Sequence, residues 1–268
     1  MSFLTAINPL FTVSGFAVGM LVGLTGVGGG SLMTPLLVLL FGTHPATAVG
    51  TDLLYACITK VGGSLVHNSN RTIDWRLVGR LASGSVPATA ITLLTASQLG
   101  YTANSSTIVS MVLGVALLLT AVSLIFRRQI MQAAIGRANR LSPRQITMLT
   151  VATGAVLGVL VSISSVGAGA LGITALIFLY PGIPIKTIVG SDIAHAVPLT
   201  LIAGLGHWMM GTVDWTMLFA LVIGSLPGIF IGAHLSSRVP EAVLRPILAV
   251  TLLIVGAKLA FQPPSHRG

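Results

Sequence analysis

The chain has 268 residues, of which 54% are hydrophobic and 7% charged, and its mean hydropathy is +0.97. Soluble domains carry about 25% charged residues, so the composition excludes an ordinary soluble fold and predicts an all-α polytopic membrane protein. The net charge of +9 does not indicate nucleic-acid binding, because five of the fourteen basic residues lie in one segment between 127 and 144, as is typical of cytoplasmic connections.

Ten hydrophobic stretches follow one another along the chain. Most approach the roughly 20 residues that cross a bilayer as a helix. The second and the seventh are shorter, and each follows a glycine- or serine-rich break, so we expect short broken or re-entrant helices there. The stretches cover residues 10–26, 28–42, 46–68, 77–97, 104–126, 146–165, 168–181, 187–210, 215–236 and 242–261.

The two halves of the chain repeat one another. VGTD at 49–52 matches VGSD at 189–192, and TIDW at 72–75 matches TVDW at 212–215, both at a spacing of 140 residues. GVGGGSL at 26–32 aligns with SVGAGAL at 165–171 at a spacing of 139. We therefore divide the chain into a first membrane repeat, 1–126, a basic cytoplasmic loop, 127–145, and a second membrane repeat, 146–268.

Five segments in each half predict an inverted repeat, because an odd number of crossings turns the second half over in the membrane. With the 127–145 loop in the cytoplasm, most other loop arginines and lysines also fall on the cytoplasmic side, and both termini lie outside. A competing count makes the two short segments re-entrant and leaves eight crossings, but it places Lys186, Arg238 and Arg245 outside.

The glycine-rich breaks are candidate substrate sites. Glycine lets the backbone unwind, and the amides freed at a helix N-terminus favour an anion. Paired interrupted segments in matching halves point to the binding site of a transporter. Tight helix packing through small residues is the alternative. The candidates are Gly28, Gly29, Gly30 and Ser31 in the first half and Ser164, Ser165, Gly167 and Gly169 in the second.

Four of the five acidic residues form two pairs across the repeat. Asp74 and Asp214 each precede a tryptophan at the start of a hydrophobic stretch, as helix-capping residues do. Asp52 and Asp192 lie within apolar sequence, where an ionisable side chain suggests a function. We expect them to hold a coupling proton or sodium ion; the alternative is helix capping, with Thr51 or Ser191 as the cap.

Lys60 lies eight residues after Asp52, about two helical turns along the same side. A lysine buried in the membrane can attract an anion, pair with an aspartate, or extend its ammonium to an interface. We expect Lys60 to bind the substrate, with hydroxyl groups from Thr51 and Tyr55 nearby and Ser191 at the position that matches Thr51. His195 follows Asp192 by one turn and is a weaker candidate.

The sequence resembles the sulfite exporter TauE/SafE family of membrane transporters. The resemblance is carried by GLTGVGGGSLMTPLL at 23–37, HPATAVGTDLL at 44–54 and VGSD at 189–192, and it extends over the whole chain. It implies a multi-pass protein of the bacterial inner membrane that exports sulfite, thiosulfate or an organosulfonate. The second half has SVGAGAL where the first has a triple glycine, so the two halves need not contact the substrate equally.

An oxyanion suits amide groups, hydroxyls and a lysine, and alternating access would move one half against the other. An anion channel, or a transporter of another small carboxylate or sulfonate, is the alternative. We find no sequence motif of an intramembrane enzyme and expect no catalysis, cofactor, metal or nucleic-acid partner. The expected partners are the anion, the lipid bilayer and a coupling proton or sodium; the apolar surface is also compatible with a homodimer.

Overall fold

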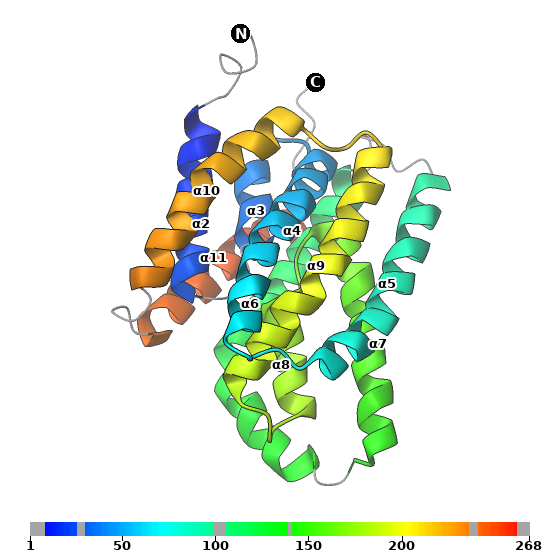
Figure 1. Ribbon diagram of the computed structural model, residues 1–268. Helices are drawn as coiled ribbons and strands as arrows, with labels where there is room; N and C mark the ends of the chain where they lie inside the picture. Colours follow the sequence, from blue (N-terminus) through cyan, green and yellow to red (C-terminus); the bar gives the residue numbers. More distant parts are fainter. Residues whose placement is uncertain (1–8, 26–29, 99–105, 139–140, 236–240, 262–268) are drawn as a thin grey trace.

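The structure is a computed structural model that describes residues 9–25, 30–98, 106–138, 141–235 and 241–261, and its regular elements in these ranges are all helices (Figure 1). This confirms the all-α prediction. In chain order the helices are α2 (Pro9–Thr25), α3 (Gly30–Leu40), α4 (Pro45–Ser69), α5 (Trp75–Gln98), α6 (Ser106–Ala138), α7 (Pro143–Ser164), α8 (Ala170–Leu179), α9 (Ile185–Met209), α10 (Trp215–Leu235) and α11 (Glu241–Phe261).

Each of the ten predicted stretches corresponds to one helix, but the segment predicted as a basic loop is largely helical. Helix α6 continues to Ala138, and α7 begins at Pro143 after a capping box formed by Ser142 and Gln145. Hydropathy marks only the apolar part of α6. The polar continuation contains three alanines, three arginines and two glutamines, which favour a helix, so α6 extends beyond its apolar part.

Five helices of the described part of the chain are long and apolar enough to cross a membrane: α5, α7 and α9 in full, Thr107–Arg127 of α6 and Trp215–Gly232 of α10. Helices α2 and α8 and the end of α11 are apolar but shorter. Helix α4 has the length of α9 but is not among the five, because it carries several polar residues. The structure therefore agrees with a multi-pass membrane protein.

Four helix pairs form the body of the molecule: α2 with α10, α5 with α7, α4 with α9, and α6 with α11. Glycines allow the backbones of the first two pairs to approach closely. A side chain at Gly84 on α5 would strike the backbone of Val151 on α7, and one at Gly224 on α10 would strike the backbone of Thr12 on α2. Such small residues are the usual means of close packing between membrane helices.

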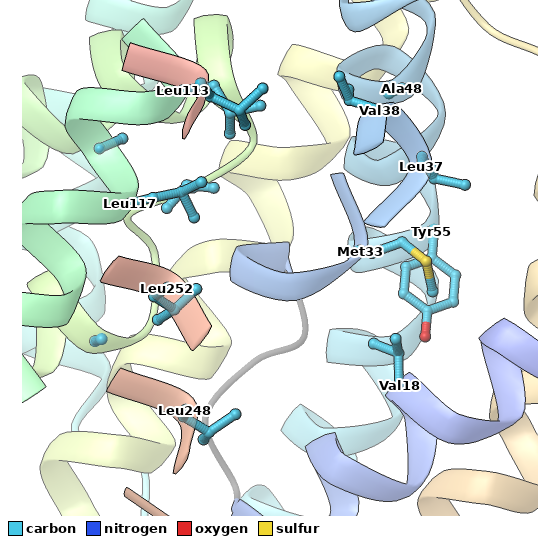
Figure 2. Close-up of a cluster of buried hydrophobic side chains, with 14 of the residues drawn as sticks. Val18, Met33, Leu37, Val38, Ala48, Tyr55, Leu113, Leu117, Leu248 and Leu252 are labelled. Carbon is cyan, nitrogen blue, oxygen red and sulfur yellow. The ribbon is translucent and has the colours of Figure 1, made fainter. Parts of the chain in front are cut away.

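A large apolar cluster fills the space between α2, α3, α4, α6 and α11 (Figure 2). Met33 of α3 lies next to the ring of Tyr55 on α4, and Leu117 of α6 lies near Leu252 of α11. A second, smaller cluster joins α4 to α9. The two short helices are thus held inside the bundle, close to the crossing of α4 and α9.

Candidate functional site

Charged side chains gather inside the bundle where α4 packs against α9. Asp52 and Lys60 come from α4 and Asp192 comes from α9, and these side chains are 0%, 6% and 1% exposed. Each aspartate is the eighth residue of its helix. The alternative that they cap these helices is therefore wrong, because capping needs a position at or before the first turn.

Asp52 is bound by hydroxyl groups from two other helices. Thr34 Oγ1 on α3 donates to Asp52 Oδ2 over 2.5 Å, and Ser165 Oγ, directly after α7, donates to the same oxygen over 2.9 Å. All three side chains are buried. Asp52 thereby connects α4 to the first short helix and to the break that precedes the second.

The break between α7 and α8 has an irregular backbone. Ser165 ends α7 in the left-handed region at φ 59°, and Gly167 and Gly169 have φ values of 127° and 125°. Such values suit glycine, whereas a β-carbon at Ser165 is unfavourable. The unwound backbone leaves the Ala168 carbonyl and the Gly169 amide outside any regular helix, directed at side chains of α4 and α9.

Lys60 reaches into this break. Its ammonium donates to the Ala168 carbonyl over 3.4 Å and interacts electrostatically with Asp192 and Asp52. The alternative that the ammonium extends to a membrane interface is therefore wrong, because the side chain is buried within the bundle. A buried cation that interacts with two carboxylates and binds a broken helix provides a charged centre inside the bundle.

Asp192 has a different environment from Asp52. Its carboxylate lies against Gly172 of α8, where any side chain would collide with it, and the Gly169 amide faces it. Neither carboxylate oxygen is hydrogen-bonded to a side chain in the described part of the chain. The two aspartates therefore match in sequence and position but not in bonding.

His195 extends the site along α9. It is fully buried, its Nε2 lies 2.8 Å from Ser85 Oγ on α5, and its Nδ1 has no hydrogen-bond partner among the described residues. Sequence reasoning ranked His195 low and missed Thr34 and Ser85. The spacing of three residues from Asp192 was a usable signal, because such neighbours share one face of a helix.

Thr51 and Ser191 hold the two halves together rather than facing the charged centre. Thr51 Oγ1 accepts a hydrogen bond from the backbone amide of Asp214 over 3.0 Å, and Ser191 Oγ accepts one from the amide of Asp74 over 2.9 Å. The predicted caps are confirmed, because Asp74 and Asp214 accept amide hydrogen bonds from the first turns of α5 and α10.

The other predicted site residues are distributed over three settings. Tyr55 lies in the apolar cluster with Met33 (Figure 2). Ser164 donates to the Leu160 carbonyl of its own helix and accepts from the Val166 amide. Gly28 and Gly29 lie outside the described residues, and Gly30 and Ser31 form the first turn of α3, the Ser31 side chain being outside the described part.

A cavity of about 530 Å³ lies elsewhere, between α6, α7 and α8. It is lined by apolar side chains such as Val156, Leu160 and Leu171, so it does not suit an oxyanion. In the described ranges no three histidine, cysteine, aspartate or glutamate side chains are grouped as metal ligands. The charged centre formed by Asp52, Lys60, Asp192 and His195 is therefore the candidate site.

Comparison with known proteins gives one protein family and a set of relatives. The family described as sulfite exporter TauE/SafE matches residues 11–259. The protein named "Probable membrane transporter protein YjnA" of Bacillus subtilis (strain 168) is 39% identical, with 91% of this chain and 96% of that protein covered. The protein named "Probable membrane transporter protein MJ0441" of Methanocaldococcus jannaschii is 24% identical, with 92% and 93% covered. No solved structure gives a significant match.

Proposed function

This chain belongs to the sulfite exporter TauE/SafE family of membrane transporters, and on that premise we propose that it exports sulfite, thiosulfate or a small organosulfonate by alternating access. The observation that carries the proposal is the buried ammonium of Lys60, which lies at the break between α7 and α8. A cation enclosed by membrane helices favours an anionic substrate and is rarely retained without a function.

The groups around Lys60 suit a sulfur oxyanion. The break offers the backbone amides of Gly167 and Ala168 and, when it is released from Asp52, the Ser165 hydroxyl. Hydrogen-bond donors with one positive charge match an anion with several acceptor oxygens. The proposed substrate site thus includes Lys60, Ser164, Ser165, Gly167 and Gly169. The sequence repeat pairs this break with Gly28–Ser31 of the first half, and we include these residues in the proposal on that ground alone. Asp52 and Asp192 are proposed to bind a coupling proton or sodium ion.

Alternating access requires two halves that move against each other, and matched contacts support an inverted repeat of residues 1–126 and 146–268 around the central segment 127–145. The hydrogen bond from the Asp214 amide to Thr51 has its counterpart in that from Asp74 to Ser191. The pair α2–α10 likewise corresponds to α5–α7. In Figure 1, α2 runs downward from its start while α7 runs upward, as opposite orientations require.

Flux measurements in proteoliposomes test the proposal. Purified protein should carry sulfite, thiosulfate or sulfoacetate with saturation, and an excess of unlabelled anion on one side should drive counterflow of labelled anion from the other. Counterflow separates a transporter from an anion channel, which cannot couple the two fluxes. Acetate and chloride serve as comparison anions. Folded protein that carries none of the three sulfur anions would contradict the proposed substrate class.

A further inference from the structure

We propose that Asp192, and not Asp52, carries the coupling proton of the transport cycle, and that the Lys60 ammonium takes the place of a coupling sodium ion. The inference rests on the proposed function above and specifies which ion gradient drives transport through that site. It follows from three features: the unequal bonding of the two aspartates, the position of the lysine, and the buried histidine beside Asp192.

The bonding of the two aspartates is unequal although they match in the repeat. Asp52 Oδ2 accepts hydrogen bonds from Thr34 and Ser165, and these donors suit an ionised carboxylate that stays ionised. Asp192 has no side-chain donor in the described part of the chain and is equally buried. A buried carboxylate with few donors gains most from taking up a proton, which removes its charge. Asp192 is therefore the carboxylate whose protonation can change during a cycle.

The position of Lys60 argues against sodium. Backbone carbonyls at the break of a discontinuous helix commonly coordinate a coupling sodium ion together with a carboxylate. Here the Ala168 carbonyl accepts a hydrogen bond from the Lys60 ammonium, which also faces Asp192 and Asp52. The Lys60 ammonium already occupies the position beside the Ala168 carbonyl and the two aspartates, so it would repel a sodium ion there. A proton on Asp192 meets no such obstacle.

His195 lies one helical turn from Asp192 and is buried near the same lysine. The two residues are three positions apart on α9, and Ser85 fixes the ring of His195 through Nε2 and leaves Nδ1 without a partner in the described part of the chain. Among the described residues, the other titratable groups around this centre come from α4: Asp52, Lys60, Tyr55 beside Asp52 and Cys57 beside the lysine. Helix α8 contributes the backbone of Gly169 and Gly172.

The consequence is a link between proton and anion binding. With both aspartates ionised and Lys60 charged, the centre has a net charge of −1 and repels an anion. A proton on Asp192 makes the net charge zero and removes one of the two carboxylate charges that attract the Lys60 ammonium, which can then bind the anion. Proton and anion should therefore bind together and move in the same direction. That direction is outward when the outward driving force on the anion, from its own gradient and an inside-negative membrane potential, exceeds the inward driving force on the proton.

The test uses proteoliposomes loaded at an alkaline pH, placed in acidic medium with labelled thiosulfate, and clamped at zero membrane potential with potassium and valinomycin. For each proton that moves with the anion, a pH difference of one unit should drive about a tenfold accumulation by the wild type. An imposed sodium gradient should have no effect. Counterflow at equal pH is measured in parallel, because it reports transport without any net driving force.

The matched variants are Asp192→Asn and Asp52→Asn, with Asp192→Glu as the conservative change. Asp192→Asn should exchange the anion more slowly and lose accumulation under the pH difference, and Asp192→Glu should restore that accumulation. Asp52→Asn is also expected to transport more slowly, but the anion that it carries should still accumulate under the pH difference; if it does not fold, the two Asp192 variants decide. Lys258→Ala, at an exposed position on α11, should keep both counterflow and accumulation. Undiminished accumulation by Asp192→Asn, or dependence on sodium, overturns the inference. Wild-type counterflow without any response to pH overturns only this inference, whereas absence of counterflow for all three sulfur anions overturns the proposed function as well.

Discussion

Ser165 Oγ donates a hydrogen bond to Asp52 Oδ2 over 2.9 Å, across 113 residues of sequence. The contact joins the break after α7 in the second half to the middle of α4 in the first. Since Ser165 also has a left-handed backbone conformation, the contact holds a strained residue in place. The shape of the break and the charge on Asp52 are thus connected through one side chain.

Removing this hydroxyl should destabilise the protein. Ser165→Ala leaves a buried carboxylate oxygen with only the Thr34 donor, and loss of a hydrogen bond to a charged group costs about 1.5–3 kcal/mol. Ser165→Gly loses the same bond but suits the φ of 59°, so it should be more stable than Ser165→Ala by about 1 kcal/mol. Thermal unfolding in detergent measures both. Equal midpoints for the two variants would show that the backbone at Ser165 is not strained.

Lys60 should contribute directly to anion affinity. Lys60→Ala removes a charged donor worth about 1.5–3 kcal/mol, so Kd for thiosulfate should rise about ten- to hundredfold. Lys60→Arg should retain part of the affinity because it keeps the positive charge. Lys258→Ala, at an exposed position on α11, is the control. Equilibrium binding in detergent gives the values, and wild-type affinity in Lys60→Ala would remove the lysine from the substrate site.

The sequence predicted the helices and the charged residues of the site better than it predicted their partners. Apolar length marked all ten helices, and a charge inside an apolar segment marked Asp52, Lys60 and Asp192. Thr34 and Ser85 were missed because a hydroxyl in a membrane helix usually bonds to its own backbone, so nothing in the sequence distinguishes one that crosses to another helix. Thr51 was assigned to the site because it shares a helical face with Tyr55 near Lys60, and Ser191 because it matches Thr51 in the repeat. Helix periodicity does not reveal that both hydroxyls instead accept backbone amides of the other half.

Thr51 and Ser191 should be equivalent in their effect on stability. Each hydroxyl accepts a backbone amide hydrogen bond from the opposite half, and a buried amide left without an acceptor costs about 1–3 kcal/mol. Thr51→Val and Ser191→Ala should therefore lower the unfolding midpoint by similar amounts, and the double variant by their sum. Ser83→Ala, which removes an exposed hydroxyl bonded within α5, is the control. A marked difference between the two variants would contradict the equivalence of the two contacts.

Labelling of introduced cysteines should reveal the inverted orientation of the two halves. Ser69 and Met209 are matched, exposed residues at the ends of α4 and α9. In a Cys57→Ala background, Ser69→Cys should react with a membrane-impermeant maleimide only after the cells are opened, and Met209→Cys should react in intact cells. Labelling of both cysteines from the same side would rule out an inverted repeat and favour a parallel one.

Gly50 and Gly190 should tolerate no side chain. A β-carbon at Gly50 would meet the Thr212 carbonyl at 2.6 Å, and one at Gly190 would collide with the Thr72 carbonyl and the His67 ring. Gly50 precedes Thr51 and Gly190 precedes Ser191, the residues whose hydroxyls join the two halves. An added methyl group therefore pushes the loop before α10 away from α4, or the loop before α5 away from α9. Overpacking of this kind costs about 1–3 kcal/mol.

Gly50→Ala and Gly190→Ala should thus unfold at lower temperature than the wild type in detergent. Gly79→Ala is the control, because its added methyl group meets nothing within 4 Å and should be neutral or slightly stabilising. Wild-type stability of Gly190→Ala would mean that the loop at Thr72 can move without loss, and that the contact between Ser191 and Asp74 is not rigid.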